Sequence, residues 1–127
     1  RDNAIQNEKL AQNLIDGFDK EALRVTLERA KTAYDTGEAL FVDVRSLGEF
    51  ESSRIPDSIL IPVGGIKGNE PNVPKDTLIF TYCTWPAEQL SARAAEYLDS
   101  VGYTNVYAGI GGFAAWKNAG YPTTAGQ

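Results

Sequence analysis

The sequence contains no histidine and one cysteine among its 127 residues. Without histidine, a cysteine nucleophile has no imidazole partner, which excludes a papain-like hydrolase. One cysteine without histidine also provides no usual zinc site, and no acidic loop has calcium-binding spacing. We therefore expect neither a metal ion nor another cofactor. A single cysteine forms no internal disulfide, so cysteine usage does not indicate the redox compartment.

Long apolar runs and excess positive charge are absent as well. No run approaches the roughly 20 residues that cross a bilayer, and the longest, 39–44 and 59–63, are typical of strands. The formal net charge is −5, whereas a nucleic-acid partner requires a positive face. We expect no nucleic-acid partner and no membrane insertion.

Methionine is also missing, and the sequence begins at Arg1. Removal of a leader would produce this pattern and favours an exported, periplasmic origin. A sequence cut from a longer one would look the same, so a cytoplasmic location stays open.

A hydrophobic content of 43% is sufficient for one core. In the N-terminal segment, Leu10, Leu14 and Phe18 recur every four residues, a spacing typical of an amphipathic helix. We therefore expect a helical extension over residues 1–22 that packs on a domain formed by residues 23–127.

Strand and helix signals alternate along that domain. Strands are predicted over 24–25, 39–44, 59–62, 77–82 and 105–107. Helices are predicted over 27–35, capped by Thr26, over 47–52, capped by Ser46, over 88–101, and after a tight turn at 109–112. This alternation predicts an α/β fold with a mainly parallel sheet.

Cys83 directly follows the second strongly apolar strand and precedes a helix. Ligands of open α/β sheets bind beyond the carboxyl ends of the strands, so we expect an exposed sulfur there. Free backbone N–H groups and the positive end of the next helix would favour a thiolate or persulfide anion. A lone cysteine is otherwise often a small buried hydrophobe.

Three stretches, in order, resemble the rhodanese family over most of residues 24–123. The first runs from 40 to 46 with Glu49-Phe50 and continues through 54–58. The second is Tyr82-Cys83 with 91–95, and the third is 111–113 with Trp116, Gly120, Tyr121 and Pro122. The resemblance implies a three-layer α/β domain, its central sheet flanked by helices, and a sulfurtransferase that holds sulfur as a persulfide on Cys83.

The active-site loop departs from the common family pattern, which is shorter and often ends in Arg. Here Cys83 is followed by Thr84, Trp85, Pro86, Ala87, Glu88 and Gln89. The loop resembles a variant subgroup with a second cysteine where Trp85 stands. Because it contains Glu88 and no Lys or Arg, we expect weak activity with thiosulfate. The better donor would be a neutral or protein-bound persulfide, and the acceptor a thiol or cyanide.

Three further residues are supporting candidates. The resemblance places Asp43 and Arg45 near the active loop, where the carboxylate would bind backbone N–H groups, although a structural ion pair is an equal alternative. Arg93, on the helix after the loop, is either a pocket contact or a solvated surface charge.

Two other functions compete with sulfur transfer. A non-catalytic rhodanese-like module would bind a partner and merely retain Cys83. A cysteine-dependent phosphatase or arsenate reductase would need an Arg five or six residues after the cysteine, where this sequence has Glu88 and Gln89. A carboxylate there repels phosphate, which disfavours this second alternative.

Overall fold

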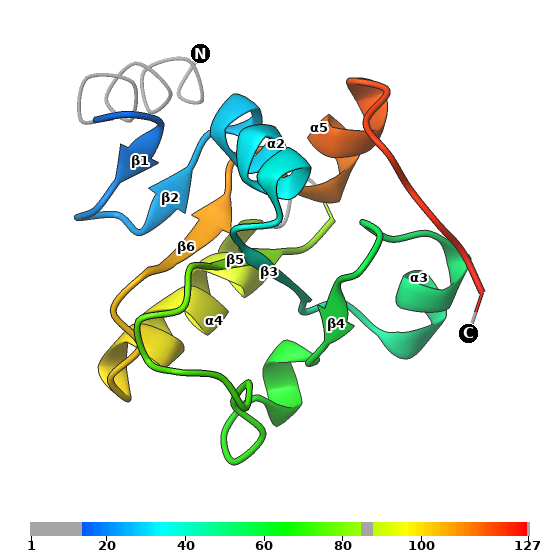
Figure 1. Cartoon of the computed structure of the whole chain (residues 1–127). Helices are drawn as coiled ribbons and strands as arrows, with labels where there is room; N and C mark the ends of the chain where they lie inside the picture. Colours follow the sequence, from blue (N-terminus) through cyan, green and yellow to red (C-terminus); the bar gives the residue numbers. More distant parts are fainter. Residues whose placement is uncertain (1–13, 85–87, 127) are drawn as a thin grey trace.

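A computed structural model describes residues 14–84 and 88–126, without the side chain of Glu88. Within these residues, six strands form one sheet in the order β1-β2-β6-β5-β3-β4 (Figure 1). β1 and β2 pair antiparallel, and every other neighbouring pair is parallel. The strands are β1 (Phe18–Asp19), β2 (Arg24–Val25), β3 (Leu40–Asp43), β4 (Ile59–Leu60), β5 (Ile79–Tyr82) and β6 (Val106–Gly109).

Apolar side chains cover both faces of this sheet, which gives the predicted three-layer α/β architecture. On one face, Ala94, Ala95 and Leu98 of α4 pack with Val42 and Ile79 in one buried cluster. On the other face, α2 and α5 contribute to a second cluster, which is rich in aromatic residues. The helices are α2 (Leu27–Thr36), α3 (Leu47–Ser52), α4 (Glu88–Ser100) and α5 (Gly112–Asn118), with the 3-10 turn η1 (Val63–Gly65).

The caps predicted from the sequence are present. The Thr26 hydroxyl accepts the Arg29 N–H at 3.1 Å at the start of α2. Ser46 caps α3 in a capping box in which Glu49 bonds back to the Ser46 N–H. These local bonds satisfy the free N–H groups of the first turns, so α2 and α3 begin where the sequence predicts.

The prediction of an N-terminal helix is wrong over residues 14–22, the part of it that the structure describes. Residues 14–17 form a turn that leads into β1, and Phe18 lies on that strand. Asp16 and Gly17 have φ values of 55° and 87°, and such left-handed residues end a helix. Residues 10–13 lie outside the described part of the chain, and the division at residue 22 stays a prediction.

Two smaller expectations also differ. Gly109 belongs to β6 rather than to the turn after it. The helix predicted over 88–101 ends at Ser100, and Val101 is 38% exposed. No helix within the described ranges is long and apolar enough to span a membrane.

Candidate active site

Cys83 lies at the carboxyl edge of the sheet, between β5 and α4. Its carbonyl accepts the N–H of Phe113 at 2.8 Å, which fixes the residue to the start of α5. Its Sγ lies 3.4 Å from the hydroxyl of Ser91 on α4. The Thr81 hydroxyl donates to the Ser91 carbonyl at 2.8 Å. These bonds attach the Cys83 side chain to α4 and the Cys83 backbone to α5.

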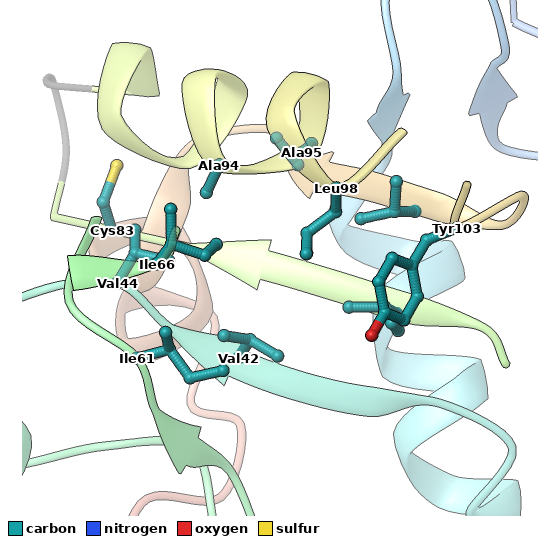
Figure 2. Close-up of a cluster of buried hydrophobic side chains, with 12 residues drawn as sticks. Val42, Val44, Ile61, Ile66, Cys83, Ala94, Ala95, Leu98 and Tyr103 are labelled. Atoms are coloured by element: carbon teal, nitrogen blue, oxygen red, sulfur yellow. The ribbon is translucent and has the colours of Figure 1, made fainter. Parts of the chain in front are cut away.

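The sulfur is not exposed, contrary to the prediction. Cys83 has 0% exposure and belongs to the cluster on the α4 face of the sheet. Figure 2 shows it at one end of this cluster, near Val44 and Ile66 and far from Tyr103. The strand end places the backbone at the edge, but the two-residue alternation along the chain turns this side chain inward. Sulfur chemistry therefore requires displacement of the groups that cover Cys83.

A groove of about 530 Å³ opens beside the next residue, Thr84. Its size falls within the range of small-molecule sites. The groove lies between α3 and α5, and its lining contains three charged side chains. The lining residues are Arg45, Gly48, Glu49, Ser52, Ser53, Thr84, Phe113, Ala114 and Lys117.

Glu49 links this groove to the start of the active loop. One carboxylate oxygen accepts the Thr84 hydroxyl at 3.0 Å, and the other lies 3.1 Å from the Ser46 hydroxyl. Burial by itself would raise the pKa of Glu49, but bonds from the Ser46 N–H and the Thr84 hydroxyl outweigh it, so the pKa is lowered. Glu49 is therefore a carboxylate at neutral pH. In the sequence, Glu49 stands out only as part of the first stretch that resembles the rhodanese family.

Asp43 and Arg45 form a buried ion pair. Arg45 Nη2 lies 2.7 Å from Asp43 Oδ2, and Arg45 Nε is 3.0 Å from both carboxylate oxygens. Asp43 also accepts the Arg45 backbone N–H at 2.9 Å. The guanidinium lies 4.5 Å from the Phe113 ring centroid and donates to the Ser53 carbonyl. The pair thereby connects β3, α3 and α5.

Asp43 also acts on the pKa of Arg45. Burial would lower the pKa of Arg45, but the hydrogen bonds and charge of Asp43 outweigh that effect and raise it. The guanidinium is thus a permanent part of the groove wall, with its charge matched by the carboxylate behind it.

The other predicted site residues are dispersed. Arg93 is exposed on α4 and does not line the groove. Glu88 and Gln89 belong to the first turn of α4, where Gln89 is exposed. Trp85, Pro86 and Ala87 lie outside the described residues. Sequence reasoning did not select Ser91, Lys117 or Phe113 for the site, because only the fold brings them near the loop.

Residues 14–84 and 88–126 contain no group of three or more potential ligands placed to hold a metal ion. The groups that the structure places at this site are the buried Cys83 thiol, the Ser91 and Thr84 hydroxyls and the charged groove beside them.

Comparison with known proteins identifies the family. The model of the rhodanese-like domain matches residues 26–119. A sulfurtransferase from Allochromatium vinosum is 32% identical over 112 residues, which cover 88% of this chain and 97% of that protein. The thiosulfate sulfurtransferase GlpE of Pseudomonas syringae pv. syringae is 34% identical over 104 residues, covering 80% of this chain and 92% of the relative.

A solved structure agrees on the fold. The BH2092 protein of Bacillus halodurans superimposes with a TM-score of 0.76 at 21% identity, over 98% of this chain and 87% of that one. Because the family match covers residues 26–119, which include β3 to β6, Cys83 and α5, the resemblance seen in the sequence is confirmed. The chain belongs to the rhodanese-like domain family, in which its named relatives are sulfurtransferases.

Proposed function

We propose that this protein transfers a sulfane sulfur through a persulfide on Cys83 to a thiol or cyanide acceptor. The observation that carries the proposal is the position of Cys83. It follows β5 at the carboxyl edge of the sheet, its sulfur lies 3.4 Å from the Ser91 hydroxyl, and the groove opens beside Thr84. The sulfurtransferase names of the relatives support the same activity.

The reaction consists of two displacements. In the first, the Cys83 thiolate attacks the terminal sulfur of the donor, a new S–S bond forms, and the donor's S–S bond breaks. The bonding pair leaves with the rest of the donor, which is sulfite when the donor is thiosulfate. In the second, cyanide or a thiolate attacks the outer sulfur of the Cys83 persulfide, and the Cys83 thiolate leaves. Neither step requires a histidine.

The surrounding groups would stabilise the sulfur anion without a cationic loop. The active loop contains no Lys or Arg, so backbone N–H groups and the Ser91 hydroxyl supply the hydrogen-bond donors. The loop residues after Cys83 are Thr84, Trp85, Pro86, Ala87, Glu88 and Gln89. In this proposal, Asp43 and Arg45 position the groove wall. The exposed position of Arg93 favours contact with an incoming partner over contact with the sulfur. The partner is a small sulfur donor or a protein that bears a persulfide.

The experiment that tests the proposal is steady-state sulfur transfer from thiosulfate or an alkyl persulfide to cyanide, followed by thiocyanate formation. We expect turnover that is abolished in Cys83→Ser, with thiosulfate the poorer donor. Thiocyanate formation that persists at the native rate in Cys83→Ser would refute the role of Cys83. No turnover with any donor, on folded protein, would favour the alternative of a non-catalytic binding module.

A further inference from the structure

The charges on the groove almost cancel one another. Its lining contains Arg45, Glu49 and Lys117, and Asp43 stands directly behind Arg45. Because Asp43 binds Arg45 at 2.7 Å, this pair contributes little net field to the groove. The charges that act on a ligand from the described lining are therefore those of Glu49 and Lys117.

Glu49 is the charge tied to the active loop. Its carboxylate accepts the hydroxyl of Thr84 at 3.0 Å, and Thr84 is bonded to Cys83 in the chain. The Ser46 hydroxyl at 3.1 Å and the Ser46 N–H at 3.3 Å fix the other carboxylate oxygen. The carboxylate is thus held at the loop rather than free to turn into solvent. Lys117, at the end of α5, is exposed, as Glu49 is on α3.

We propose that Glu49 is a specificity-determining residue that selects against dianionic sulfur donors in favour of donors with less negative charge. The inference rests on the proposed sulfur transfer and identifies its substrate class. In this proposal the donor approaches Cys83 past Thr84, and its negative charge then comes near the Glu49 carboxylate, which accepts the Thr84 hydroxyl. The repulsion grows with the charge on the donor, so a dianion is penalised about twice as strongly as a monoanion.

A matched pair of donors isolates this effect. Thiosulfate is a dianion, and methanethiosulfonate is its analogue in which a methyl group replaces one oxygen, which leaves a single charge. In both, Cys83 forms the same persulfide as the donor's S–S bond breaks, and the bonding pair leaves with sulfite or with methanesulfinate. The ratio of kcat/KM for the two donors, compared between variants, cancels their different intrinsic reactivities.

The variant Glu49→Gln removes the charge with little change in shape. Glutamine at the third position of a helix also completes a capping box, so α3 is retained. With the glutamine oxygen on Ser46, the amide N–H group faces Thr84 and donates to its hydroxyl. The matched control is Glu51→Gln, which removes one charge from the same helix at a residue outside the groove lining.

At low ionic strength, Glu49→Gln is expected to raise the ratio of kcat/KM for thiosulfate over methanethiosulfonate about fivefold. The gain should shrink near 1 M salt, where the screening length falls to about 3 Å. Glu51→Gln should leave the ratio within about twofold, and Lys117→Gln should lower it. The readouts are single-turnover sulfur loading by intact mass and the steady-state rate.

Two contrary results have different meanings. If the native protein loads sulfur but Glu49→Gln leaves the donor ratio unchanged, or changes it no more than Glu51→Gln does, Glu49 does not select the donor and sulfur transfer still stands. If the native protein accepts sulfur from neither donor, both the proposed function and this selectivity fail.

Discussion

At the scale of single residues, the site combines a buried thiol with a hydroxyl partner. Cys83 and Ser91 are both fully buried, and Sγ lies 3.4 Å from the Ser91 oxygen. In this geometry the neutral thiol donates to the hydroxyl. When the sulfur becomes an anion, the Ser91 hydroxyl can rotate and donate to it, and hydrogen bonds to charged groups are stronger than those between neutral groups.

Ser91→Ala tests that contact. We expect the rate of sulfur loading on Cys83 to fall about tenfold or more while KM for the donor changes little, since a hydrogen bond to an anion contributes about 1.5–3 kcal/mol. Ser91→Thr, which keeps a hydroxyl, should recover part of the rate. Ser100→Ala, at the exposed end of the same helix, is the control. Native loading in Ser91→Ala would show that the hydroxyl only fills space.

Asp43→Asn tests the buried ion pair. The change leaves the Arg45 guanidinium buried with a neutral partner, and breaking such a pair typically costs about 3–5 kcal/mol in the free energy of unfolding. Urea denaturation measures it. The control is Asp35→Asn, which removes an exposed pair with Lys31 worth less than about 1 kcal/mol. Equal losses in the two variants would contradict a structural role for the Asp43–Arg45 pair.

At the scale of elements, local chemistry explains what the sequence could predict. The caps at Thr26 and Ser46 are contained within four residues, so α2 and α3 were predictable from sequence alone. The four-residue spacing of Leu10, Leu14 and Phe18 was misleading because it ignored Asp16-Gly17, a dipeptide typical of tight turns. Phe18 instead packs on Tyr107, with ring centroids 4.6 Å apart.

The start of α5 depends on Gly111. Its φ is 83°, and a Cβ there would lie 2.6 Å from the Cβ of Ala115. Gly111→Ala should therefore lower the free energy of unfolding by about 1–3 kcal/mol, through backbone strain and this clash. Because Phe113 binds the Cys83 carbonyl, sulfur loading should slow as well. Gly120→Ala, at a φ of 77° with no atom within 4 Å, separates strain from the clash. Equal losses in both variants would exclude the contact with Ala115.

Glu70 attaches the loop after η1 to α4 and makes this attachment pH-dependent. The Tyr97 hydroxyl and the Gly68 N–H donate to its carboxylate and lower the pKa of Glu70 to about 2. A lowered folded-state pKa stabilises the fold above the ordinary value of 4.5, and this contribution is lost as the pH falls toward 2.

Comparison of native protein with Glu70→Gln by thermal unfolding between pH 6 and pH 2 measures this contribution. We expect the native protein to be the more stable above about pH 5, and the difference in Tm to vanish toward pH 2. A Tm difference that is constant across this range would show that the carboxylate charge of Glu70 plays no part.

At the scale of the whole molecule, the sheet order decides the site. Parallel pairing of β3, β5 and β6 brings the residues after each strand to one edge, so Arg45, Cys83 and the start of α5 meet there. Alternating strands and helices made this edge predictable. The inward turn of Cys83 and the contributions of Glu49, Ser91 and Lys117 were not, because they depend on side-chain directions and on contacts between distant segments.

The N-terminal segment also belongs to this scale. β1 extends the sheet beside β2, and Phe18 packs on the aromatic cluster through Phe80 and Tyr107. Phe18→Ala should therefore lower the free energy of unfolding of the entire domain by about 2–4 kcal/mol, measured by urea denaturation. A loss below about 0.5 kcal/mol, as for surface substitutions, would indicate a segment that is only loosely attached.

The most direct test of sulfur transfer is the intact mass of the protein after incubation with thiosulfate, and separately with an alkyl persulfide, beside Cys83→Ala treated in the same way. We expect the native protein to gain one sulfur, about 32 Da, to lose it again on addition of cyanide or thiol, and Cys83→Ala to gain none. An unchanged mass of the folded native protein with both donors, or the same gain in Cys83→Ala, would contradict a persulfide on Cys83.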